Sequence, residues 1–127
     1  MKRTPLRKKS KRGMKPMKDK ADRQLQDHYR FTYPDEKCES CGGKYHIMHH
    51  FVEKSQSSRL RYEHENLIFL CNPCHFRHHR TGDASIMAKV ILRRGEKWLK
   101  NLMTLKREYL DINKKSFLEA IIEKYHV

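Results

Sequence analysis

Two Cys-x-x-Cys pairs constrain the fold of this 127-residue chain more than any other feature. The pairs are Cys38/Cys41 and Cys71/Cys74, with residues 42–70 between them. Each pair forms a knuckle whose two thiolates reach one tetrahedral Zn²⁺, and two knuckles complete a closed four-sulfur site. The alternatives are a redox Cys-x-x-Cys and two local disulfides, and no thioredoxin-like βαβ pattern accompanies the pairs. The sequence therefore predicts a structural zinc, which supplies folding energy that a small core lacks.

The charge of the chain is strongly positive and concentrated at its N-terminus. The chain has 29 Lys+Arg and 15 Asp+Glu, a formal net charge of +14, and its first 20 residues contain a single acidic side chain, Asp19. Residues 1–16 lack apolar periodicity and are predicted to be a disordered basic arm. Such a charge density attracts phosphate polyanions by counterion release, so nucleic acid is the expected partner. The alternative is a solubilising or localisation tail.

Membrane and secretory classes do not fit the sequence. No apolar run approaches the ~18–20 residues of a membrane-spanning helix, and no signal-peptide core follows the basic start. We therefore expect a cytoplasmic protein without a membrane partner.

Helical periodicity recurs on both sides of the cysteine-rich region. Before it, four apolar residues at helical spacing predict a short amphipathic helix: Met17, Ala21, Leu25 and Tyr29. After it, residues 83–126 predict three helices. Asp83 caps the first and Gly95 ends it, the second runs through Trp98, and a capping box of Ser116 and Glu119 begins the third. Their apolar faces are interpreted as core rather than as a partner surface.

The histidines gather in the same region as the cysteines. Seven of the nine lie within residues 38–79: His46, His49, His50, His64, His75, His78 and His79. His75 and His79 stand at i, i+4, which stacks both imidazoles on one helix face and suits a single ion. His49 and His50 are adjacent, so on a strand one can face a metal while the other faces substrate or solvent. Asn66 precedes the apolar run 67–70, which is typical of a buried strand. The cluster favours a second, open metal site.

This arrangement resembles the HNH nuclease motif in its zinc-stapled ββα-metal form. The resemblance rests on His49-His50, on Asn66 and on Leu70-Cys-x-x-Cys-His75-x-x-x-His79. A narrower likeness, to the phage NinG-type (Rap) recombination nucleases, rests on Leu60-Arg61-Tyr62-x-x-x-Asn66 and Arg94-Gly95-Glu96-x-Trp98-Leu99. The resemblance implies a small α+β fold with a treble-clef-like metal core at 38–80 and C-terminal helices at 83–126. Together with the preceding helix these form one nuclease domain at 17–127.

The resemblance also implies an activity and a role for each site residue. The activity is metal-dependent endonucleolytic hydrolysis of DNA, in phage-type recombination, by a phage-encoded or nucleoid-associated protein. His50 is implied as the general base, and Asn66 as the residue that holds it by a hydrogen bond. His49, His75 and His79 are implied to bind one catalytic divalent cation. Imidazole ligands suit Mn²⁺, Ni²⁺, Co²⁺ or Zn²⁺ better than Mg²⁺, which phosphate and water oxygens can still help to bind.

Four arginines bracket the motif and are predicted to contact DNA phosphates: Arg59, Arg61, Arg77 and Arg80. Their alternative interpretation is a solvated basic face. The alternative function, from a different class, is a zinc-stapled nucleic-acid-binding module without hydrolytic activity. The clustered histidines and Asn66 favour the nuclease, because binding alone requires none of them.

Overall fold

The computed structural model describes the backbone of residues 6–127 and the side chains of residues 14–127. It divides into two compact units: helix α1 together with Asp111–Val127, and Tyr33–Leu110. This division differs from the single nuclease domain expected at 17–127, because α1 and α5 pack against each other and form a unit of their own. Among the described residues, no helix is long and apolar enough to cross a membrane.

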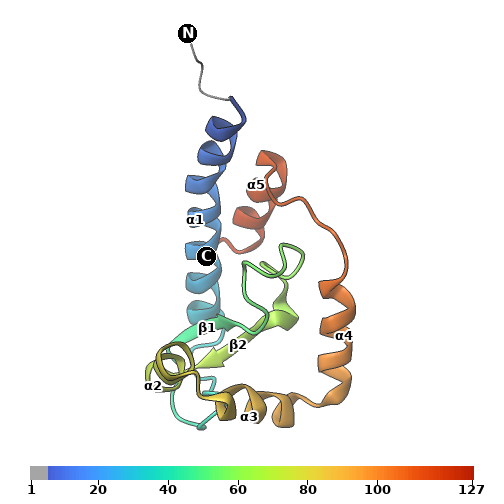
Figure 1. Ribbon diagram of the computed structural model, residues 1–127. Helices are drawn as coiled ribbons and strands as arrows, with labels where there is room; N and C mark the ends of the chain where they lie inside the picture. The colour runs from blue at the N-terminus through green and yellow to red at the C-terminus, as the bar shows by residue number, and fades with distance from the viewer. Residues whose placement is uncertain (1–5) are drawn as a thin grey trace. The chain divides into compact units, whose positions relative to one another are not determined.

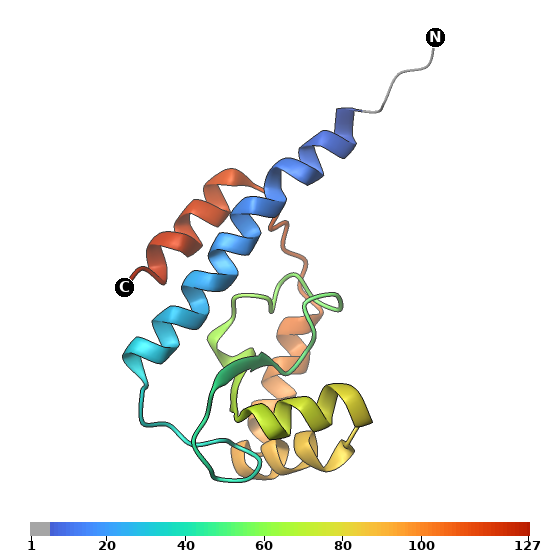
Figure 2. The ribbon, with the colours of Figure 1, turned by 90° about the vertical axis from the view of Figure 1, so that its left-hand side faces the viewer.

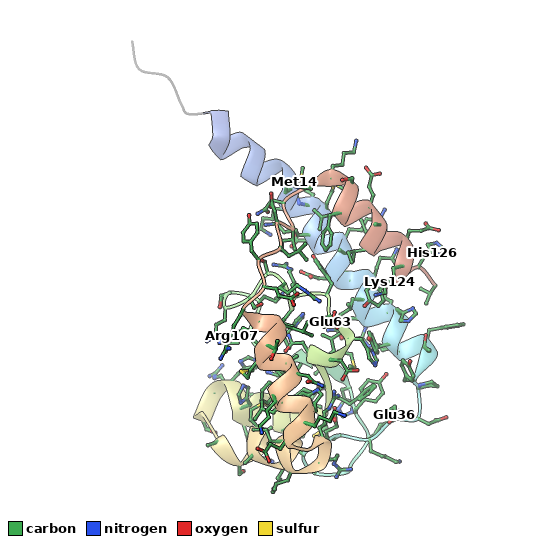
Figure 3. The ribbon with its side chains drawn as sticks, turned by 90° about the vertical axis from the view of Figure 1, so that its right-hand side faces the viewer. Met14, Glu36, Glu63, Arg107, Lys124 and His126 are labelled. Carbon is green, nitrogen blue, oxygen red and sulfur yellow. The ribbon has the colours of Figure 1, made fainter. Side chains whose placement is uncertain are left out.

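The first unit is a pair of helices, α1 (Leu6–Thr32) and α5 (Lys115–Lys124), which lie side by side (Figures 1 and 2). The predicted apolar face of α1 is confirmed, since Ala21, Leu25 and Tyr29 are buried. The ring of Tyr29 lies 6.1 Å from that of Tyr125, at the end of α5. Figure 3 shows side chains along both helices, including Met14 on α1 and Lys124 on α5.

The structure differs from the predicted disordered arm at residues 6–16, where α1 begins at Leu6 and continues through Pro16. Residues 1–5 lie outside the described part of the chain. Lys and Arg are good helix formers, so a helix anchored by its apolar C-terminal half can extend into a segment without apolar periodicity.

The predicted capping box of α5 is also wrong. Lys114 is the N-cap of α5, without a side-chain cap hydrogen bond, and Ser116 lies inside the helix. The helix is stabilised instead by burial of Leu118 and Ile121, and an exposed pair joins Lys115 to Glu119 at 3.9 Å. Packing of an amphipathic face outweighs a cap of about 1 kcal/mol in deciding where a helix starts.

The second unit is built on a two-stranded antiparallel sheet. Strand β1 (Ile47–His50) pairs with β2 (Leu67–Leu70), with His49 opposite Ile68 and His50 opposite Leu67. The short helix η1 (His64–Asn66) leads into β2, and α2 (Asn72–Phe76) follows it. Helix α2 passes without a break into the π-helical turn η2 (Arg77–Thr81) (Figure 2). The sheet and this helix form the expected ββα core.

Two further helices complete this unit, α3 (Ala84–Arg94) and α4 (Glu96–Lys106) (Figure 1). The predicted ends of α3 are confirmed: Asp83 accepts a hydrogen bond from the Ser85 amide at 3.0 Å, and Gly95 follows the helix with φ +97°. Buried residues of β2 and α3 share one apolar cluster with three of the cysteines: Ile68, Leu70, Ile86, Val90, Cys38, Cys71 and Cys74. The core of this unit is therefore continuous with the predicted zinc site.

Candidate metal centres

The four cysteines converge as the sequence predicts. Their four Sγ atoms all lie within 4.8 Å of one another: Cys38, Cys41, Cys71 and Cys74. The Sγ atoms of Cys41 and Cys71 are 3.6 Å apart. Two thiolates bound to one tetrahedral zinc at ~2.3 Å stand about 3.8 Å apart, so this spacing fits zinc. All four cysteines are free thiols rather than disulfides. The cluster supports a zinc-stapled core.

The backbone around these sulfurs favours their anionic form. The amide of Cys41 donates to Cys38 Sγ at 3.5 Å, that of Gly43 to Cys41 Sγ at 3.4 Å, and that of Cys74 to Cys71 Sγ at 3.4 Å. Burial raises the pKa of Cys71 to about 12. Burial also opposes ionisation of Cys38, but amide hydrogen bonds lower the pKa of that thiol to about 7. Four thiolates at this spacing would repel one another, and a bound cation such as Zn²⁺ would stabilise them.

Three histidines form a second group of convergent ligand atoms. One ring nitrogen each of His49, His75 and His79 lies within 4.8 Å of the other two. The ring centroids of His75 and His79 are 4.5 Å apart, and that of His49 lies 5.1 and 5.0 Å from them. Between them the helix widens into η2, where the Gly82 amide bonds to the Arg77 carbonyl five residues earlier. A wider turn brings residues four apart more nearly into line, which helps both imidazoles face β1.

His49 has the properties of a neutral metal ligand. It is 6% exposed, and its buried Nε2 has no hydrogen-bond partner among the described residues. Burial, with smaller contributions from His75, His78 and His79, lowers the pKa of His49 to about 3, so the ring is neutral at pH 7. A buried lone pair facing two other imidazoles fits a divalent cation better than it fits solvent or core.

His50, the next residue, is half-buried and has a different partner. Its Nε2 lies 2.7 Å from the carbonyl oxygen of Arg61. A carbonyl only accepts, so Nε2 carries the proton and donates it. In the neutral ring the lone pair therefore belongs to Nδ1.

The structure differs from the expected hydrogen bond between Asn66 and His50, because the Asn66 side chain bonds to other residues. The Asn66 side chain accepts from the Val52 amide at 2.7 Å and donates to the carbonyls of Val52 at 3.0 Å and Leu60 at 3.1 Å. Asn66 is 0% exposed, so these bonds are buried. They tie the two ends of the loop between β1 and η1 together. Asn66 thus fixes the loop that contains Arg61, and Arg61 rather than Asn66 bonds to His50.

Comparison with protein families matches this part of the chain to one description, HNH endonuclease, over residues 38–81. Residues 38–81 are therefore similar to an HNH endonuclease domain. The match includes all four cysteines, His49, His50, Asn66, His75 and His79. Comparisons with curated proteins and with solved structures found no match. The HNH resemblance is therefore confirmed, whereas the narrower likeness to NinG-type nucleases stays a prediction.

Two of the four bracketing arginines have acidic partners inside the second unit, Tyr33–Leu110. Arg59 bonds to Glu63 at 3.2 Å and to Glu108 at 3.1 Å (Glu63 is labelled in Figure 3). Arg77 donates to Cys74 Sγ at 3.4 Å and lies 3.6 Å from Asp83.

The other two arginines lie against aromatic rings. The Arg61 guanidinium lies 5.6 Å from the ring centre of Tyr62, and that of Arg80 lies 5.4 Å from Phe76. Arg80 and Phe76 are exposed on the helix that carries His75 and His79. Arg80 is therefore an exposed arginine that directly follows a residue of the histidine cluster.

Sequence reasoning gave no role to the ion pair of Glu39 and Arg94. Arg94 Nε and Nη2 donate to the two carboxylate oxygens of Glu39 at 2.6 and 2.8 Å. Glu39 lies between the first two cysteines and Arg94 ends α3, so no local spacing links them. The only available signal was the stretch from Arg94 to Trp98, noted for its family likeness.

Proposed function

We propose that this chain is a metal-dependent DNA endonuclease that hydrolyses phosphodiester bonds. One arrangement supports the proposal above all: the convergent imidazoles of His49, His75 and His79 stand next to His50, whose ring is held by a backbone carbonyl. The HNH domain implies a nucleic-acid substrate. A module that only binds nucleic acid needs neither an open set of three imidazoles nor an oriented fourth one.

In the proposed reaction His50 is the general base. Its Nδ1 takes a proton from water, because the Arg61 carbonyl keeps the other ring proton on Nε2. The oxygen of that water forms a bond to phosphorus while the bond from phosphorus to the 3′-oxygen breaks. The leaving oxygen gains a proton from solvent, and the Nδ1 proton returns to solvent afterwards. Asn66 contributes by position, through the loop that it ties.

His49, His75 and His79 are the residues that would hold the catalytic cation. An imidazole adds no charge when it binds a cation, so the ion would keep its full charge and retain positions for oxygen ligands. A bound divalent cation supplies positive charge to the phosphate oxygens and to the departing 3′-oxygen. Burial, followed by the neighbouring rings of His79 and His78, lowers the pKa of His75 as well, which keeps that ring available as a ligand.

The proposed DNA contacts are the exposed Arg80, which directly follows His79, and the half-buried Arg61, whose carbonyl bonds to His50. Arg59 and Arg77 would have to exchange carboxylate partners for phosphate. The likeness to NinG-type phage nucleases supports branched DNA as one substrate to test.

The function is tested with protein stripped of metal and reloaded with zinc and one further divalent cation. Supercoiled plasmid, flap DNA, a four-way junction and single-stranded RNA are the substrates. We expect Mn²⁺- or Ni²⁺-dependent cleavage of DNA that His50→Ala abolishes and that the control His126→Ala, an exposed residue labelled in Figure 3, retains. Tight DNA binding without cleavage in any metal would replace the proposal by the binding module, and cleavage of RNA alone would change the substrate.

A further inference from the structure

We propose that Trp98 and Arg94, on the C-terminal helices, are positioning residues for His50. They hold the backbone on both sides of Asn66 and thereby the loop to which His50 is hydrogen-bonded. This inference rests on the proposed function, in which His50 is the base. It makes α3 and α4 part of the catalytic framework rather than a separate extension.

Two side chains, those of Trp98 and Arg94, hydrogen-bond to the backbone around Asn66. Trp98 Nε1 donates to the carbonyl of Glu65 at 2.8 Å, and Arg94 Nη1 reaches the same oxygen at 3.4 Å. Arg94 Nη2 donates to the carbonyl of Leu67 at 2.8 Å. The carbonyls of the two residues that flank Asn66 are therefore hydrogen-bonded from the C-terminal helices, that of Glu65 from α3 and α4 and that of Leu67 from α3.

Arg94 is itself held rigidly. Its bidentate pair with Glu39 has side chains only 18% and 11% exposed, and Glu39 Oε2 also accepts from the Phe69 amide at 2.7 Å. Its guanidinium lies 5.1 Å from the ring centre of Trp98. A planar guanidinium that is hydrogen-bonded on two edges and lies against a ring has little rotational freedom. The position of α3 therefore determines where Arg94 holds the Leu67 carbonyl at the start of β2.

Trp98 also reaches the residue after His50. Its ring packs edge-on against Phe51 with centroids 4.9 Å apart, and the Phe51 amide donates to the Asn66 carbonyl at 2.8 Å. One side chain thus contacts the residue after β1 through its ring and η1, which leads into β2, through its N–H.

Two more hydrogen bonds connect the backbone at Asn66 to His50. Asn66 donates to the Leu60 carbonyl at 3.1 Å, and the carbonyl of Arg61, the next residue, accepts from His50 at 2.7 Å. If the backbone at Asn66 shifts, the Arg61 carbonyl shifts with it and the His50 ring turns. Misplacement of a reacting group by about 1 Å can cost ~100-fold in rate.

The test uses Trp98→Phe, which keeps a ring against Phe51 but loses the N–H to Glu65. We expect the single-turnover cleavage rate to fall by about tenfold or more, with DNA affinity and metal affinity unchanged, because the bonds to DNA and cation do not involve Trp98. The NMR signal of the His50 Nε2 proton should shift or broaden. Arg94→Lys, which loses the bidentate grip, should show the same pattern and provides a second variant if Trp98→Phe does not fold.

Val90→Ala is the matched control, because Val90 is a buried α3 residue of the apolar cluster against which Trp98 also packs, but its aliphatic side chain cannot hydrogen-bond to Glu65 or Leu67. It should lower the melting temperature without lowering the cleavage rate. The inference is overturned if Val90→Ala slows cleavage as much as Trp98→Phe does at equal loss of stability. It is also overturned if the folded variants keep the parental His50 signal. If the parent protein cuts no substrate but the variants still move that signal, the positioning inference stands and the proposed function fails.

Discussion

His49 and His50 illustrate how one residue step separates two environments. Alternation along β1 turns their side chains to opposite faces, so His49 is 6% exposed among other imidazoles while His50 bonds to the Arg61 carbonyl. The same residue type therefore serves as a neutral ligand candidate in one position and as a base candidate in the next.

Replacing each of these histidines should separate the two roles. His50→Ala is expected to keep metal binding and DNA affinity but to lose about 10²–10⁴ in cleavage rate, as for loss of a general base. His49→Ala should instead lower metal affinity and recover part of its activity at high metal concentration, because two imidazoles remain. Calorimetric metal titration beside cleavage assays measures both. Loss of metal by His50→Ala and its retention by His49→Ala would reverse the assignment.

The low pKa of His49 also predicts that the free energy of unfolding decreases in acid. Its pKa is about 3 in the folded protein against 6.5 ordinarily, so between these pH values the unfolded chain binds more protons. The free energy of unfolding should therefore be unaffected by His49 above pH 6.5 and fall as the pH drops toward 3. His49→Asn should make urea midpoints less dependent on pH between 7.5 and 5. Parallel pH dependences for variant and parent would show that His49 is not buried as a neutral ring.

Asn66 is expected to matter for stability before it matters for chemistry. Asn66→Ala leaves the Val52 amide and the carbonyls of Val52 and Leu60 without their buried partner. Because an unsatisfied buried group costs about 1–3 kcal/mol, we expect a loss of roughly 3 kcal/mol or more in urea unfolding. Asn101→Ala, at an exposed position of α4, is the control and should change little. Equal stabilities of the two variants would contradict the buried clamp.

At the scale of elements, the helix formed by α2 and η2 joins the two metal centres. It carries Cys74 and His75 as neighbours, and Arg77 donates to Cys74 Sγ from the turn that leads to His79. A cation bound at the cysteines would fix the start of this helix and therefore the direction of both histidines. The two centres should not respond independently.

Removing one thiolate tests this dependence. Cys41→Ser should release zinc, lower the melting temperature by many degrees and weaken metal binding at the histidines, although residue 41 lies outside that helix. Zinc content by atomic absorption and melting by circular dichroism measure the first two effects, and calorimetry the third. A variant that melts like the parent would exclude a structural zinc.

At the scale of the whole molecule, the net charge of +14 and its concentration near the N-terminus are the properties most relevant to nucleic acid. Residues 6–13 continue α1 rather than forming the expected disordered arm. The attraction of this segment to phosphate depends on the number of its basic residues and on the salt concentration.

Neutralising this segment should reduce DNA affinity without changing the chemistry. Full-length protein with Gln at seven basic positions should bind DNA more weakly, with a shallower dependence on salt and a nearly unchanged single-turnover rate: Lys2, Arg3, Arg7, Lys8, Lys9, Lys11 and Arg12. Deletion of residues 1–13 should weaken DNA binding in the same way if the charge of this segment, rather than its helical structure, is responsible for the binding. Filter binding across salt concentrations measures both variants, and an unchanged slope would exclude this segment as a DNA contact.

The amino-acid sequence determined the features that depend on short spacings. The Cys-x-x-Cys pairs, the i, i+4 histidines after the second pair and the alternation at His49 and His50 each fix local geometry, so the two ligand groups could be predicted from the sequence. The ends of α3 followed from Asp83 and Gly95 for the same reason.

Only the tertiary structure decided which distant groups meet. Asn66 bonds to Val52 and Leu60 rather than to His50, Arg94 pairs with Glu39 far away in the chain, and α1 packs on α5. Spacing along the chain carries no information on such pairs, because a buried polar group can be satisfied by any donor or acceptor that packing brings within about 3 Å. Local spacing in the sequence therefore determined which residues are candidate metal ligands. The hydrogen bonds that orient His50 depended instead on how the helices and the sheet pack together.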